Sequence, residues 1–201
     1  MKTLFYLSAS PRGERSHSRT MGNHFLRQFL AARPDWRVDE LDLSQHSLPE
    51  LDATLVSARM KISAGEELDE GERAAWEAVK LEFRRFEASD FYLISTPLWN
   101  FGLPYSLKHY IDFITQPGIA FGSRDHKASH GVLEGRRMAV VYATGAPESD
   151  ERGDLIKRHL ENWAEFVGIH VSCFRHSPYE AGSRERCEMA IDSYLEDLVL
   201  P

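Results

Sequence analysis

Apolar runs of strand length alternate along this chain with longer segments whose apolar residues recur every three or four positions. A continuous apolar run is typical of a strand covered on both faces, whereas the longer spacing is typical of an amphipathic helix. Strands are expected over residues 3–7, 91–95, 138–142 and 169–174, and also over residues 36–43, where apolar and polar residues alternate with one slip. Helices are expected over residues 21–30, 76–86, 107–114, 156–167 and 187–198. This alternation predicts an α/β domain built on a mainly parallel sheet.

Residues 49–71 interrupt the alternation. This segment is polar, and five carboxylates cluster from its end into the next residue, over positions 66–72, so we expect a surface excursion whose acidic side is solvated. Asp69 and Glu72 have the spacing of a capping box, which predicts that the following helix begins there.

The charge balance limits the partners. The chain has 24 Lys and Arg against 31 Asp and Glu, a net charge of −7. Proteins that bind duplex DNA or anionic membranes normally need a basic face, so neither is an expected partner. Cys173 and Cys187 form neither a disulfide framework nor a zinc motif, and free thiols are expected. No signal peptide and no apolar run near ~18 residues is seen, so a cytoplasmic protein is expected.

Polar residues follow the first expected strand. Ligands of parallel sheets bind at the carboxyl ends of the strands, so the loops after strands one, three and four are the places to search. The first loop carries Ser10 and the run Ser16-His17-Ser18 directly before a helix, with Arg12 and Arg15 nearby. A helix N-terminus attracts anions, and no nucleotide-binding glycine motif is present. The loop therefore favours a monophosphate, although Ser16 is also typical of a simple helix cap.

Large apolar residues follow the third expected strand. Leu98, Trp99 and Phe101 lie between Pro97 and Pro104, where exposure to water would be unfavourable. Alone, such a loop is also typical of a hydrophobic plug. Beside a phosphate-binding loop, it favours a planar ring that carries a phosphate.

These two loops, followed by Leu107-Lys108 and Asp112, resemble the FMN-dependent NADH-azoreductase and NAD(P)H:quinone oxidoreductase family. The resemblance runs over essentially the whole chain. It implies a flavodoxin-like fold with a five-stranded parallel sheet, strand order 2-1-3-4-5, and helices on both faces. It also implies that residues 1–201 form a single FMN-binding domain, with FMN as cofactor and NADH or NADPH as co-substrate.

The resemblance also assigns roles to residues. It implies that the phosphate is held by Ser10, Ser16, His17 and Ser18, and that the ring is contacted by Pro97, Leu98, Trp99, Asn100 and Phe101. After the fourth strand, backbone groups of Thr144 and Gly145 are expected to contact the flavin.

The sequence departs from the family in this last loop. It reads Ala143-Thr144-Gly145-Ala146, where the family commonly has a Ser-Arg-Gly-Gly type of loop. Because charge near the ring tunes a flavin, the missing arginine is expected to alter flavin potential or substrate choice. Phe121 matches an aromatic residue that faces the substrate in the family's dimer, although a core position is the alternative.

The expected activity is a two-electron, ping-pong transfer from NAD(P)H through FMN to a quinone or an azo compound. The flavin carries this chemistry, so no side chain is assigned a catalytic role, and a homodimer is expected because the family's site lies between subunits. The alternatives are a flavodoxin-type single-electron carrier and a flavin-free hydrolase or binding module. His126 and His130 lack the further ligands that a metal needs, and no Gly-x-Ser-x-Gly motif supports a hydrolytic pair of Ser10 and His17.

Overall fold

A parallel sheet lies at the centre of the molecule. The computed structural model describes residues 1–124 and 128–200, with side chains for all of these except residues 123, 124 and 128–130. The sheet has the order β2-β1-β3-β6-β7, with every neighbouring pair parallel. This confirms the order 2-1-3-4-5 for the five expected strands. Their bounds are β1 Thr3–Ser8, β2 Arg37–Asp42, β3 Phe91–Pro97, β6 Arg136–Ala143 and β7 Ile169–His176.

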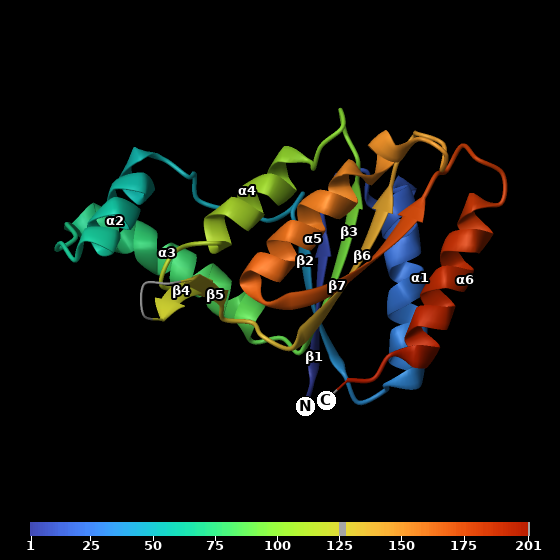
Figure 1. The fold of residues 1–201 in the computed structure, drawn as a ribbon, viewed down its shortest axis with the longest axis horizontal. Coiled ribbons are helices and arrows are strands. Elements are labelled where there is room, and N and C mark those ends of the chain that lie inside the picture. The colour runs from blue at the N-terminus through green and yellow to red at the C-terminus, as the bar shows by residue number, and fades with distance from the viewer. Residues whose placement is uncertain (125–127, 201) are drawn as a thin grey trace.

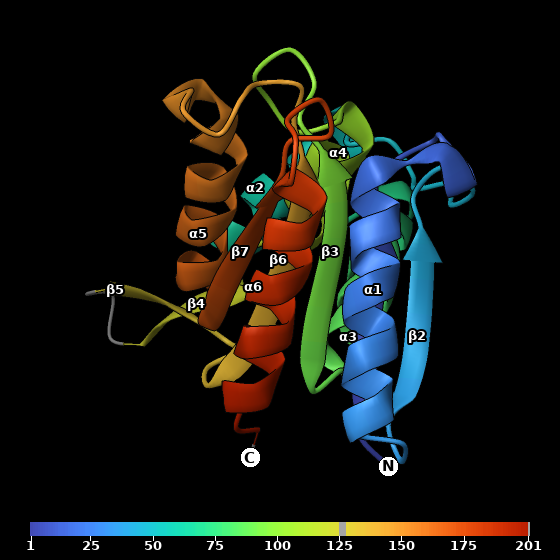
Figure 2. The same cartoon turned by 90° about the vertical axis from the view of Figure 1, so that its right-hand side faces the viewer.

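Helices cover both faces of this sheet, as Figures 1 and 2 show. One face is covered by α1 (His17–Ala32) and α6 (Ser183–Asp197). The other is covered by α3 (Glu70–Glu87), α4 (Tyr105–Ile114) and α5 (Leu155–Val167). None of the helices within the described residues is both long enough and apolar enough to cross a membrane.

The apolar strand residues supply both halves of the core. In β1, Leu4 and Tyr6 pack toward α1 and α6, whereas Phe5 and Leu7 pack toward the other face. Phe5 is completely buried, and its ring meets that of Phe86 edge-on at 5.4 Å. Full burial of such a side chain stabilises a fold by about 1.5–3 kcal/mol. A polar residue in this run would therefore weaken one of the two layers.

A helix lies within residues 49–71, where the sequence pattern predicts none. Helix α2 (Ala53–Ala64) begins at Asp52, whose side chain accepts a hydrogen bond from the Leu55 amide, and ends at Gly65 in a left-handed conformation. Only Leu55 and Ala58 of α2 are buried. Because α2 packs mainly on α3 and projects with it beyond the sheet (Figure 1), it needs only a narrow apolar stripe and leaves no clear periodicity.

The capping box at the start of α3 is confirmed, but the expectation of a wholly solvated acidic side is wrong. Asp69 and Glu72 exchange hydrogen bonds of 2.8 and 2.9 Å. Glu72 is buried, and its carboxylate also accepts from Ser57 (2.6 Å) and Lys61 (2.8 Å) of α2. The bonds from Lys61 and Ser57 lower the pKa of Glu72 to about 2. This carboxylate therefore joins α2 to α3 and remains charged.

A two-stranded antiparallel hairpin, β4 (Phe121–Arg124) and β5 (Ala128–Gly131), also goes beyond the sequence prediction. Its close packing on α5 needs a glycine, because a Cβ on Gly131 would lie 2.0 Å from the carbonyl carbon of Val167. The Phe121 ring lies 4.7 Å from that of Phe166 on α5. The strands are too short to show a period in the sequence.

Candidate functional site

Three loops meet in a cleft at the carboxyl edge of the sheet. These loops follow β1, β2 and β3. In the sheet, β2 lies on one side of β1 and β3 on the other, so the strand order reverses at β1, and the cleft lies at this point. Its volume is about 380 Å³. The lining residues are Ala9, Pro11, Leu43, Ser44, Gln45, His46, Ser47, Trp99, Tyr105 and Ser106.

The loop after β1 holds buried hydroxyl groups that lack partners. Ser10 is 1% exposed, and among the described residues its Oγ has no hydrogen-bond partner; the same holds for Ser8 Oγ. An unsatisfied buried polar group costs about 1–3 kcal/mol, so it points to a missing polar ligand. The loop therefore favours binding of a group rich in hydrogen-bonding oxygen atoms.

The same loop leads into the N-terminus of α1. Ser16 caps this helix by accepting from the Arg19 amide at 3.3 Å, and its Oγ lies 3.1 Å from that of Ser18. The first amides of a helix, here those of His17 and Ser18, have no carbonyl partner within it. Together with the helix dipole, they make this end suitable for a phosphate.

The loop after β3 exposes a flat apolar surface. Trp99 is 38% exposed and Phe101 59%, which is unusual for side chains of this size. Trp99 and Gly102 exchange backbone hydrogen bonds of 3.0 and 2.9 Å, which close a tight turn. Within it, Asn100 (φ 49°) and Phe101 (φ 65°) adopt a backbone conformation that costs free energy for residues with side chains. This strained, exposed aromatic turn fits the binding of a planar ring.

The loop after β6 lies beside the loop after β3, next to the cleft but not among its lining residues. Leu98 donates to the carbonyl oxygen of Ala143 at 2.8 Å, which fixes this loop against the aromatic turn. Thr144 is buried, its amide donates to the His176 carbonyl at 3.0 Å, and its Oγ1 accepts from the Ala146 amide at 3.1 Å. The exposed Gly145 amide donates to no group within residues 1–124 and 128–200. It is available to a ligand.

Comparison with known proteins agrees with this geometry. Residues 1–198 match the profile of a family described as having a flavodoxin-like fold. The chain belongs to this flavodoxin-like family.

Two curated relatives in the family are named FMN-dependent NADH:quinone oxidoreductase. The Desulfotalea psychrophila protein is 37% identical over 192 residues, which cover 92% of this chain and 91% of the relative. The Nitratidesulfovibrio vulgaris protein is 40% identical over 173 residues, with coverage of 84% and 82%. The chain is also similar in fold to an FMN-dependent NADH-azoreductase from Bacillus anthracis, whose structure was solved in complex with FMN. The two structures superpose with a TM-score of 0.83 over 98% of each chain, and their sequences are 24% identical.

The flavodoxin-like fold brings most of the expected site residues to one edge. The serine loop, the aromatic turn and the loop after β6 all lie at the carboxyl ends of the strands. Phe121 does not join them: it lies on β4, packed on α5 away from that edge (Figure 1). His126 lies outside the described residues, and the side chain of His130 is likewise not described.

The loop after β7 contributes residues that the sequence search missed. The His17 ring lies 5.9 Å from that of His176 and 6.3 Å from that of Tyr179, which is 81% exposed. Burial, together with the charges of His17 and Arg184, lowers the pKa of His176, which favours its neutral form. This loop follows the fifth expected strand, so extending the same strand-end rule to that strand would have found it.

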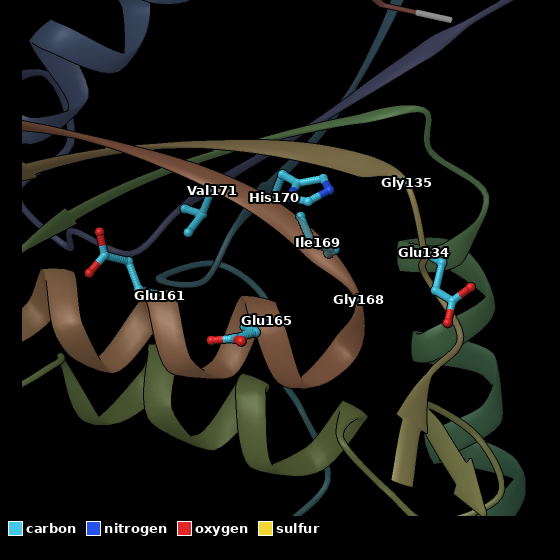
Figure 3. Close-up of a pocket in the computed structure, with 8 residues that line it drawn as sticks. All are labelled: Glu134, Gly135, Glu161, Glu165, Gly168, Ile169, His170 and Val171. Atoms are coloured by element: carbon cyan, nitrogen blue, oxygen red, sulfur yellow. The ribbon is translucent and has the colours of Figure 1, made fainter. Parts of the chain in front are cut away.

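A larger hollow, of about 530 Å³, lies at the opposite edge of the sheet (Figure 3). It is lined by Glu134, Glu161 and Glu165 and by the start of β7. Figure 3 shows these three carboxylates pointing in different directions. No group of three metal-ligating side chains is found in the described part of the chain. Because this edge carries the amino ends of β6 and β7, we do not place the functional site there.

The two cysteines take no part in the site. Both are free, as expected, and burial raises the pKa of Cys173 and of Cys187 to about 12. Neither thiol is ionised near neutral pH, so neither is a nucleophile.

Proposed function

We propose that this chain is an FMN-dependent oxidoreductase that transfers electrons from NADH to quinones and azo compounds. The observation that carries the proposal is the placement of the Ser10 hydroxyl, which has no partner in the described part of the chain, and of the helix N-terminus at the same sheet edge as an exposed aromatic turn. A phosphate and a flat ring are the two parts of FMN that such a pair of loops fits. The printed names of the relatives from Desulfotalea and Nitratidesulfovibrio support the same activity.

The residues divide the binding of FMN among three loops. The phosphate is held by Ser10, Ser16, His17 and Ser18, whose loop supplies hydroxyl groups and helix amides. The ring is held by Pro97, Leu98, Trp99, Asn100 and Phe101, which supply the apolar wall and a polar contact at its edge. Thr144 and Gly145 bound the remaining side, where the Gly145 amide is a free donor.

FMN, when bound, supplies the chemistry: it accepts a hydride from NADH and returns two electrons to the acceptor. The chain's own residues anchor the phosphate, shield one side of the ring and leave room for donor and acceptor to bind in turn. The reaction needs no side chain as an obligatory acid or base, so no side chain is given a catalytic role.

We also infer a homodimer. Phe101 and Tyr105 expose large aromatic surfaces beside the cleft, which favours burial by a second copy. Phe121 lies away from its own cleft, so it reaches a substrate only if it enters the cleft of the partner. Sedimentation velocity should show a species of twice the chain's mass; a monomer at all working concentrations would contradict this inference.

We further infer that residues 1–201 act as one FMN-binding domain in the cytoplasm. The two hydrophobic clusters connect elements from β1 to α6, which supports a single folding unit. Two free cysteines suit a reducing compartment.

The test combines an FMN titration with a steady-state assay. The protein should bind one FMN per chain, and its oxidation of NADH should accelerate when a quinone or an azo dye is added. FMN binding without that acceleration would favour a single-electron carrier. A protein that takes up no FMN would contradict both activities and favour a flavin-free module.

A further inference from the structure

The side chain of Arg175, near the end of β7, lies against the loop after β6. Its side chain is only 12% exposed. Nη1 donates to the Asp154 carboxylate (3.2 Å) and to the Asp150 carbonyl oxygen (3.3 Å). Nη2 donates to the carbonyl oxygens of Ala146 (3.1 Å) and Pro147 (2.5 Å). One guanidinium therefore ties together the loop after β6 and the short helix η2 (Glu151–Asp154) that follows it.

Two neighbours fix the guanidinium in this position. The buried Tyr142 hydroxyl donates to Asp154 at 2.6 Å, and burial together with this carboxylate raises the pKa of Tyr142, so the donor keeps its proton. Gly153 leaves room on the other side, because a Cβ there would lie 2.2 Å from Nη2 of Arg175. The position of Arg175 thus depends on its own hydrogen bonds, on Tyr142, which holds the partner Asp154, and on the missing side chain at residue 153.

This arrangement occupies the carbonyl groups of the loop and leaves an amide open. The Ala146 carbonyl accepts from Arg175 and also from Ser177 Oγ at 2.9 Å. The Thr144 amide is bonded to β7, whereas the Gly145 amide donates to no described group.

We propose that Arg175 is a positioning residue of the flavin site, an inference that rests on the function proposed above. It holds the loop after β6 so that the Gly145 amide is left to donate a hydrogen bond to an acceptor atom of the flavin ring. The fork of the guanidinium is essential to this role, because a single ammonium group cannot reproduce its several directed hydrogen bonds.

The test uses protein labelled with [15N]glycine, so that the amides of its 13 glycine residues can be followed by NMR. The variant Gly145→Ala removes one of these signals and so identifies the signal of Gly145. The Gly145 φ is not positive, and a Cβ there meets Tyr179 at an ordinary 3.7 Å, so this variant should fold. In the wild type, the Gly145 signal should move when FMN is added. In Arg175→Met, the Kd for FMN should rise at least tenfold, about 1.4 kcal/mol, and that movement should be lost. Arg84→Met, which removes an exposed arginine on α3, is the matched control and should bind FMN as the wild type does.

Two further variants separate positioning from charge. Arg175→Lys keeps the charge and should weaken binding as Arg175→Met does; restored binding by lysine would overturn the positioning role. Gly153→Ala keeps the arginine but displaces it, and should also raise the Kd for FMN. If Arg175→Met does not fold, Gly153→Ala and Tyr142→Phe decide the question in the same assay.

The outcomes distinguish this inference from the proposed function. A wild type that binds no FMN contradicts the function itself. A wild type that binds FMN, with Arg175→Met and Gly153→Ala showing the same Kd and the same movement of the Gly145 signal, overturns only the role of Arg175.

Discussion

Replacing Ser10 with alanine should stabilise the FMN-free protein and weaken FMN binding at the same time. The Ser10 hydroxyl is buried and has no partner among the described residues, and such a group costs about 1–3 kcal/mol, so its removal should raise the free energy of unfolding without FMN by roughly 1 kcal/mol. With FMN bound, the same hydroxyl should donate to a charged phosphate. Loss of a hydrogen bond to a charged group costs about 1.5–3 kcal/mol, which corresponds to a Kd raised about ten- to a hundredfold.

Ser89→Ala is the matched control for this variant. Ser89 Oγ is equally buried without a described partner, but it lies just before β3, at the amino end of that strand. Chemical denaturation without FMN should show a similar stabilisation of both variants. With FMN at 100 times the wild-type Kd, the ligand should stabilise Ser89→Ala by about 2.7 kcal/mol, and Ser10→Ala, at a tenfold higher Kd, by about 1.4 kcal/mol. Equal stabilisation of the two variants by FMN would refute the assignment of Ser10 to the phosphate site.

Three further predictions follow from single contacts. Trp99→Leu should raise the Kd for FMN up to about tenfold, because an aromatic stacking contact contributes about 0.5–1.5 kcal/mol. The melting temperature of the FMN-free protein should stay unchanged, because the Trp99 side chain is part-exposed. Glu72→Gln should lower the free energy of unfolding at neutral pH. Because folding depresses the pKa of Glu72 from about 4.5 to about 2, the difference in stability between wild type and variant should shrink as the pH falls through this range. A difference that does not depend on pH would contradict the ion pair. Gly131→Ala should destabilise the protein by about 1–3 kcal/mol by forcing a Cβ against Val167, whereas Gly122→Ala, whose Cβ meets no described atom within 4 Å, should not. Equal melting temperatures of the two variants would disprove the close packing.

The central sheet could be predicted from the sequence because its inner strands β1, β3 and β6 are buried on both faces and appear as apolar runs. The edge strand β2, of which only Leu41 is buried, shows an alternation of apolar and polar residues instead. The helices that cover the sheet have wide apolar stripes, as in α3. Helix α2 could not be predicted in this way, because it buries only Leu55 and Ala58. The burial of Glu72 depends on Lys61 and Ser57 of that same helix, so it became visible only once α2 was placed.

The candidate site was predictable where residue type alone carries the chemistry. Serines before a helix and aromatic residues after a buried strand point to a phosphate and a ring without coordinates. What the sequence lacks is the direction of side chains between strands. Arg175 and His176 directly follow the fifth expected strand, which ends at residue 174, and only the pairing of β6 with β7 shows that they lie beside the loop after β6. The resemblance to the family shows that the loop after β6 lacks an arginine, but it does not show that the guanidinium of Arg175 reaches this loop.

Anaerobic titration of the FMN-loaded protein tests the central claim most directly. One equivalent of NADH per FMN should bleach the visible flavin absorbance, and one equivalent of a quinone should restore it at least as fast as steady-state turnover. Absorbance that NADH leaves unchanged, or that a quinone restores far more slowly than turnover, would contradict the account.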